Sequence, residues 1–193
     1  MGAALELFLE QGFAATTVAE VARAAGVSPE TIYKQLGGKP GIVRALYESA
    51  IAGEGPEPAF VRSDRLRSEP DPYVIARGWS ELAMEVGPRV TPLMLLVRDA
   101  SLVDPTLREL LAELDEANHR RMRANAAFLH KAGHLRPGVS RAEAADVLWT
   151  LTSAEMFELM VVRRGWSIRR WADFVYRGVA SLLRPQNVEV PPA

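Results

Sequence analysis

Apolar side chains recur three and four positions apart along most of the chain, which is the periodicity of amphipathic α-helices. Near the start, a first helix is predicted to end at Gly12, and a second helix to begin after Thr17. The pattern breaks at Gly26, resumes after Ser28, and resumes again from Lys39. No stretch alternates apolar and polar residues as a half-buried strand would. The N-terminal pattern therefore predicts four consecutive helices.

The second and third of these helices carry strong boundary signals. Thr17 and Glu20 have the spacing of a capping box, in which hydroxyl and carboxylate each accept a hydrogen bond from a backbone amide of the first turn. Gly26 can adopt the left-handed conformation that turns the chain sharply. Ser28 followed by Pro29 is typical of an N-cap and a first helical residue. Two short helices joined by a tight turn indicate a helix-turn-helix unit, whose second helix enters the DNA major groove.

The prolines between residues 53 and 72 interrupt the helical pattern, so we predict a helix-turn-helix domain at 1–52 and a second domain at 53–193. Helical periodicity then returns. The predicted segments are 73–86, 93–103, 105–132, a helix that Ser140 and Glu143 open and that runs to Arg164, and a last helix that Ser167 caps. The expected fold is all-α, an N-terminal three-helix helix-turn-helix module followed by a C-terminal helical domain, with about nine helices.

Composition restricts the chemistry of the chain. Its 193 residues are 48 % hydrophobic and 24 % charged, which is the range of ordinary globular proteins. Without cysteine there are no disulfides, thiolate nucleophiles or cysteine-bound zinc. We expect a cytoplasmic protein with no membrane partner, because neither a signal peptide nor a run long enough to span a bilayer is recognisable. The net charge of −1 gives no general attraction to nucleic acid, so DNA binding has to rest on local geometry.

Several spacings in the first 50 residues together resemble the TetR family of one-component transcriptional repressors. They are the Gly12-Phe13 pair that ends the first helix, Thr17 opening the second, a Ser-x-x-Thr-x-Tyr pattern over residues 28–33, and Lys39 at the start of the fourth helix. The rest of the chain resembles the family in helix order and length. The resemblance implies a homodimer with one DNA reader per subunit. It also implies a C-terminal pocket for a small-molecule effector that releases the protein from its double-stranded DNA operator.

The same resemblance implies which residues contact DNA. Thr17 and Lys39 correspond to the family's phosphate contacts, and Tyr33 to a contact with the DNA backbone or a thymine methyl group. Gln35 stands in place of the common histidine. Taken singly, these residues are explained as helix caps and surface side chains, but their joint spacing favours DNA contact. The predicted DNA-binding residues are Thr17, Ser28, Pro29, Thr31, Tyr33, Lys34, Gln35 and Lys39.

The predicted C-terminal domain offers two further candidate surfaces. One is a ligand pocket between helices, with apolar walls and a few polar anchors; ordinary core is the alternative for each residue. Its candidates are Trp79, Met84, Met94, Arg98, Asn118, Met122, Asn125 and Phe128. The other is a dimer interface, because the last two helices are too apolar all round for one small domain to cover; a monomer's core is the alternative. Its candidates are Met156, Leu159, Met160, Val162, Trp166, Trp171, Phe174 and Gly178.

The function that these features favour is a ligand-responsive, DNA-binding transcriptional regulator, and specifically a repressor that a small molecule releases. The alternative is an all-α interaction or sensor module that keeps the fold but binds DNA weakly or not at all. An enzyme is not expected, since no nucleophile–base pair or phosphate-binding loop is recognisable. His130 and His134 are four residues apart, but Gly133 ends the helix between them. We therefore expect no metal site and no cofactor.

Overall fold

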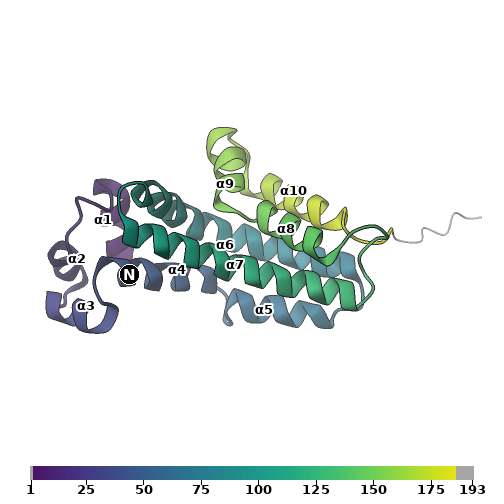
Figure 1. Cartoon of the computed structure of the whole chain (residues 1–193), viewed down its shortest axis with the longest axis horizontal. Helices are drawn as coiled ribbons and strands as arrows, with labels where there is room; N and C mark the ends of the chain where they lie inside the picture. Colours follow the sequence, from purple (N-terminus) through teal and green to yellow (C-terminus); the bar gives the residue numbers. More distant parts are fainter. Residues whose placement is uncertain (1, 186–193) are drawn as a thin grey trace, which may run out of the picture.

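Helices make up the computed structural model, which describes residues 2–185 and contains no strand within them. The three helices α1, α2 and α3 lie at one end, and the long helices α6 and α7 run from there along the molecule (Figure 1). The all-α prediction is confirmed. The α-helices are α1 (Gly2–Gln11), α2 (Val18–Ala25), α3 (Pro29–Leu36), α4 (Lys39–Ala52), α5 (Ala59–Arg65), α6 (Pro72–Ser101), α7 (Pro105–Lys131), α8 (Arg141–Leu151), α9 (Ala154–Phe157) and α10 (Ile168–Ala180).

The predicted boundaries of the helix-turn-helix are present. Thr17 caps α2 in a complete capping box with Glu20, and Gly26 has a φ of 67° where α2 ends. The Ser28 hydroxyl accepts a hydrogen bond from the amide of Thr31 and so caps α3. A close approach follows, because a Cβ at Gly41 in α4 would lie 1.5 Å from the Leu36 carbonyl oxygen. The position therefore requires glycine.

Helix α6 differs from the prediction of two separate segments. It runs unbroken from Pro72 to Ser101, with Pro88 and Pro92 inside it. A proline in a helix interior removes a hydrogen bond and costs roughly 3 kcal/mol in isolation. Here α6 is the central helix, because it packs against α1, α4, α5, α7, α9 and α10. We attribute the continuity of α6 to packing against these helices, which cannot be predicted from the sequence around Pro88 and Pro92.

Two other predictions of element boundaries were wrong. The segment 53–72, expected to be a connection, contains helix α5 and a 3₁₀ turn over Leu66–Ser68. The helix expected to reach Arg164 ends at Leu151 instead. Thr152 leaves the helical conformation, and the Ser153 hydroxyl caps a new start by accepting a hydrogen bond from the Met156 amide. Helix α9 then continues as a π-helix, Glu158–Arg163.

Two clusters of buried apolar side chains form the core. The first joins α1–α4 to the adjoining parts of α6 and α7, with Phe8, Val43, Val97 and Leu107 fully buried in it. Each such side chain contributes about 1.5–3 kcal/mol. The second cluster lies between α6, α7, α8 and α10, around Trp171. The first cluster crosses the predicted boundary after residue 52, so the N-terminal helices are packed firmly against the rest of the chain.

Candidate DNA-binding surface and ligand cavity

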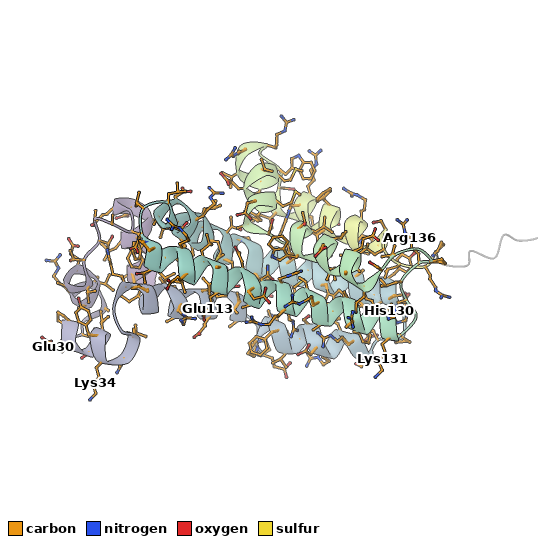
Figure 2. All side chains as sticks on the ribbon, in the orientation of Figure 1. Glu30, Lys34, Glu113, His130, Lys131 and Arg136 are labelled. Atoms are coloured by element: carbon orange, nitrogen blue, oxygen red, sulfur yellow. The ribbon has the colours of Figure 1, made fainter. Side chains whose placement is uncertain are left out.

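The outward face of α3 is polar and lies at one end of the molecule. Ile32 is 5 % exposed and anchors α3 to the N-terminal core, whereas Tyr33 is 58 % exposed. Lys34 and Gln35 are exposed beside Tyr33. Figure 2 shows the Glu30 and Lys34 side chains pointing away from the body of the protein. Because an amphipathic helix of eight residues buries one face only, this face is free to contact a partner.

The hydroxyl groups predicted to contact DNA also serve as helix caps. Thr17 Oγ1 and the Thr17 amide both donate to the Glu20 carboxylate, over 2.8 Å each. These backbone and side-chain bonds lower the pKa of Glu20 below its usual value. A phosphate bound at the start of α2 would therefore lie beside a carboxylate. Ser28 lies within hydrogen-bond distance of the Thr31 hydroxyl at the start of α3, and Pro29 is its first residue.

Lys39 has a structural partner that sequence reasoning missed. Its ammonium nitrogen donates to the Phe13 carbonyl oxygen over 2.7 Å and lies 4.4 Å from the centre of the Phe13 ring. The side chain thus ties the start of α4 to the turn between α1 and α2. Contact between Lys39 and a DNA phosphate remains a prediction. To make it, the ammonium group would have to use an N–H that does not bond to the Phe13 carbonyl oxygen.

Thr16 is a second residue that the motif analysis passed over. It is fully buried, and its hydroxyl lies 2.9 Å from the Gly12 carbonyl oxygen and 3.2 Å from that of Leu7. These bonds tie the turn after α1 to the last turn of that helix. The adjacent residues Thr16 and Thr17 therefore have different roles. Thr16 bonds to the end of α1 and the turn after it, and Thr17 caps the start of α2. A hydroxyl residue directly before a capping residue was the available signal.

A cavity of about 350 Å³ lies between α4, α5, α6, α7, α8 and α10. Its walls are mainly apolar and aromatic, which is typical of small-molecule sites. Four of the eight residues predicted for a ligand pocket line it: Trp79, Asn118, Met122 and Asn125. The sequence analysis did not select the residues that α4 and α10 contribute, among them Tyr47, Ile51 and Trp171.

The other four predicted pocket residues do not line this cavity. Met94 is buried in the first apolar cluster, and Arg98 forms an ion pair with Glu158 over 2.9 Å. The Phe128 ring packs 6.1 Å from the His134 ring, between the ring centres. Met84 lies on a different face of α6, because the lining stripe of that helix passes through residues 79, 82, 83, 86, 87 and 90. Amino-acid type alone does not tell which face of a helix lines the cavity, so the sequence prediction included residues on other faces.

Burial also sets the state of Tyr47, which is 8 % exposed. Burial, and secondarily the negative charge of Asp115, raises the pKa of Tyr47 to about 12. The Tyr47 phenol therefore stays protonated near neutral pH and can donate a hydrogen bond at the cavity. Trp79 uses its indole N–H within the protein, donating to the Ser63 carbonyl oxygen over 3.3 Å.

The residues predicted for a dimer interface separate into two groups. Leu159 and Val162 of the π-helix are 46 % and 63 % exposed, and Met156, Met160, Trp166 and Phe174 are half-buried. The others pack inside their own subunit. The Trp171 ring is 1 % exposed and lies 4.8 Å from the Phe157 ring, between the ring centres. Gly178 packs against Leu151, where a Cβ would come within 2.5 Å of a methyl carbon. The monomer's core is therefore the observed location of Trp171, whereas Gly178 is half-buried.

Two kinds of feature are absent from the described part of the chain. Over residues 2–185, no helix combines the length and the apolar character that a bilayer span requires. Within the same residues, no three side chains of histidine, aspartate or glutamate lie close enough together to hold a metal ion. His119 instead lies 3.2 Å from an oxygen of Asp146, as a pair between α7 and α8.

Residues 1–46 match the family model of bacterial regulatory proteins of the tetR family. No curated protein sequence matches the chain. Among solved structures, the SmeT–triclosan complex is 20 % identical with a TM-score of 0.74, covering 99 % of this chain and 92 % of that chain. NalD, the secondary repressor of the MexAB-OprM multidrug efflux pump in Pseudomonas aeruginosa, is 20 % identical with a TM-score of 0.67, covering 95 % and 93 %.

The TetR-family transcriptional regulator PfmR from Thermus thermophilus is similar along a comparable length. It is 20 % identical with a TM-score of 0.60, covering 92 % of this chain and 96 % of that chain. At these identities the structural likeness shows the fold, and the match over residues 1–46 adds the N-terminal module. Residues 1–46 thus match the N-terminal module of the tetR family, and the chain has the fold of TetR-family regulators along nearly its whole length.

Proposed function

We propose that this protein is a ligand-responsive, DNA-binding repressor that a small molecule releases from its operator. The observation that carries the proposal is the exposed polar face of α3, held at the tip of a module that matches the tetR family model. A repressor role is supported by the similarity in fold to NalD, which is described as a repressor. Such a protein acts in the cytoplasm, where it meets the chromosome.

In this proposal, α3 enters the major groove with Tyr33, Lys34 and Gln35 toward the bases and phosphates. Residues 1–52 act as the reader, and residues 53–193 hold the ligand and the dimer contact. The chain carries a net charge of −1, so attraction to DNA depends on where its cations lie. Lys34 lies on the outward face, while the Lys39 ammonium is already bound to the Phe13 carbonyl oxygen.

Helix α4 is the element suited to connect ligand and DNA. Ile42, Val43 and Leu46 of α4 are buried in the cluster that holds α1–α3, while Tyr47 and Ile51 line the cavity one to two turns further on. A ligand that displaces the cavity wall therefore acts on the same helix that positions the reader. Release requires that the ligand bind more tightly to the conformation that DNA does not accept.

A homodimer completes the proposal, because one reader contacts only one half of a two-fold symmetric operator. The apolar residues exposed on the π-helix, Leu159 and Val162, supply a surface that a second copy would cover. Half-buried Trp166 and Phe174 extend this surface on and beside α10. An isologous contact places the same residues of both subunits against one another.

A DNA-binding experiment tests the proposed reader. Genomic fragments selected by the purified protein are used in a gel-shift assay at low salt, together with the variants Tyr33→Ala and Lys34→Ala. We expect each variant to weaken binding by about 5- to 100-fold, because contacts to bases or phosphates contribute roughly 1–3 kcal/mol each. The matched control is Lys131→Ala, an exposed lysine at the opposite end of the molecule (Figure 2).

The control variant should bind fragments as the parent protein does. If no genomic fragment is selected or shifted at low salt, the protein is instead the sensor module that keeps the fold without reading DNA. If Lys131→Ala weakens binding as much as Lys34→Ala, the effect is one of overall charge and α3 is not the reading helix.

A further inference from the structure

One face of α7 supplies the charged side chain and both amide side chains that line the cavity. Asn118, Arg121, Met122 and Asn125 all line it, and their spacing of three, one and three positions puts them on one stripe of the helix. We call these four residues the α7 stripe. The opposite wall, from α6, is largely apolar and includes Leu82, Val86 and Val90. Within the cavity, the lining face of α7 is thus more polar than that of α6.

Two arginines share a single carboxylate beside the α7 stripe. Arg121 lies 2.9 Å from one oxygen of Asp64, and Arg67 lies 3.0 Å from the same oxygen. Arg121 also donates to the Phe60 carbonyl oxygen over 2.6 Å. Two guanidinium groups carry two positive charges against one negative charge, so this cluster has an excess of one positive charge at the edge of the cavity.

Arg67 is only partly satisfied by these contacts. Its Nε is buried and has no hydrogen-bond partner within residues 2–185. Burial lowers the pKa of Arg67, and the neighbouring charge of Arg121 lowers it further, while Asp64 opposes both effects. Two guanidinium groups that share one carboxylate in a partly buried place are incompletely compensated, and a second anion nearby would be favourable.

The amide of Asn125 has an orientation that its neighbour dictates. Arg67 donates to Asn125 Oδ1 over 2.7 Å, and since arginine has no acceptor, the oxygen must be the atom facing it. The NH₂ group of Asn125, which is 4 % exposed, is therefore directed elsewhere as a donor. Asn125, the Arg121 guanidinium and the protonated Tyr47 phenol all present donors around the cavity.

The side chains that line the cavity carry no compensating negative charge. Among the described lining residues, Arg121 is the one charged side chain, and no aspartate or glutamate is present. A cationic ligand would have aromatic walls but no carboxylate to pair with. An anionic ligand would pair with Arg121 and would accept hydrogen bonds from Asn125.

We propose that the cavity binds an amphipathic carboxylate, with the carboxylate group at Arg121 and Asn125 and the apolar body along Trp79, Leu82 and Val86. Such a carboxylate would be the effector of the repressor proposed above. Only the release of DNA on binding depends on that proposed function. Binding itself is a property of the isolated protein and is measured without DNA.

Matched ligands that differ in the head group alone test the proposal. Calorimetric titration compares decanoate with decan-1-ol, and 2-naphthoate with 2-naphthol, at neutral pH and below any micelle concentration. We expect at least one carboxylate to bind about 10- to 100-fold more tightly than its neutral counterpart, the size expected for hydrogen bonds to a charged group. If no carboxylate of the panel binds more tightly than its counterpart, the proposal is wrong.

Two variants locate the head group. Arg121→Met removes the charge at similar length, and Asn125→Asp removes the donor and neutralises Arg67; each should remove the preference for carboxylate while leaving binding of the neutral ligand. Arg121 also bonds to Phe60 and Asp64 of α5, so Arg121→Met can prevent folding; in that case Asn125→Asp alone tests the site. The control is Arg120→Met, whose side chain is 58 % exposed and pairs with Glu116 outside the cavity. An unchanged preference in both variants would place the carboxylate elsewhere.

DNA release is then measured separately with the same ligands. If the protein binds carboxylates but neither binds nor releases DNA, the proposed repressor function fails and the ligand class stands. If DNA is bound but carboxylates show no preference over neutral ligands, the ligand class fails and the repressor function stands.

Discussion

Lys39 shows how one side chain can serve packing where a motif suggests binding. Its ammonium group bonds to the Phe13 carbonyl oxygen and lies over the Phe13 ring, so it is partly committed before any DNA is present. The partner is 26 positions away in the sequence, and no local pattern identifies it. A loss of DNA binding on substitution of Lys39 would therefore not by itself show a phosphate contact.

We predict that Lys39→Met destabilises the protein by about 1–2 kcal/mol, because it removes a hydrogen bond to a charged group and leaves the Phe13 carbonyl unpaired. Urea unfolding followed by circular dichroism measures the change. Lys34→Met is the matched control, since its exposed side chain has no contact in residues 2–185 that the fold needs, and we expect a change within about 0.5 kcal/mol. Equal stability of both variants would remove the structural role of Lys39.

At the scale of the elements, Glu85 of α6 holds the connection between α4 and α5. Its carboxylate accepts hydrogen bonds from Arg62 of α5 over 2.6 and 2.9 Å, and from the Glu54 amide over 2.7 Å. These bonds, with the Arg62 side chain as the main cause, lower the pKa of Glu85 from 4.5 to about 2. The Glu85 and Arg62 side chains are only 26 % and 20 % exposed, which limits screening by solvent.

This pKa predicts a pH dependence of stability. Because the folded pKa lies below the unfolded one, Glu85 contributes its full stabilisation above about pH 4.5, and the contribution is lost as the pH falls toward 2. We expect Glu85→Gln to cost on the order of 2–3 kcal/mol at pH 7, with the difference from the parent protein shrinking between pH 5 and pH 2. Thermal unfolding across this pH range measures the difference.

Glu81→Gln provides the control on the same helix, because Glu81 is exposed and has no hydrogen bond or ion pair in the described residues. The free energy of unfolding of the Glu81→Gln variant should equal that of the parent protein at every pH. A constant difference between Glu85→Gln and the parent from pH 7 to pH 2 would show that the ionised carboxylate is not the source of the stabilisation.

At the scale of the whole molecule, the π-helix presents the surface that we propose for contact with a second copy. Leu159 and Val162 project from the π-helix at the edge of the bundle formed by α6, α7, α8 and α10. The Glu158 side chain, which is 15 % exposed, forms ion pairs with Arg98 of α6 and with Arg163. The pair with Arg98 ties the π-helix to α6. The apolar residues are thus presented on a fixed element, as an interface requires.

We predict that the double variant Leu159→Arg and Val162→Arg converts a dimer into monomers at micromolar concentration, because it places like charges opposite each other across an isologous contact. Sedimentation velocity measures the mass. The control is Val103→Arg, since Val103 is 82 % exposed but lies in the turn between α6 and α7. A parent protein that sediments as a monomer, or a double variant that remains a dimer, would contradict the proposed interface.

Local sequence was sufficient wherever a few neighbouring residues decide the structure. The capping box of Thr17 and Glu20, the left-handed Gly26 and the Ser28 cap define the helix-turn-helix, because each bond is made within one turn of helix. The inward Ile32 and outward Tyr33 follow from helical periodicity. The family resemblance, which the match over residues 1–46 supports, rests on these same positions.

The tertiary structure decided what depends on residues far apart in the chain. Helix α6 continues through Pro88 and Pro92, where the helices packed around it outweigh the local cost of two prolines. Trp171 proved to be core, and Met84 and Met94 lie outside the cavity, because amino-acid type does not tell which face a neighbouring helix covers. The bonds of Lys39, Glu85 and Arg67 to distant partners exist only after packing has brought those groups together.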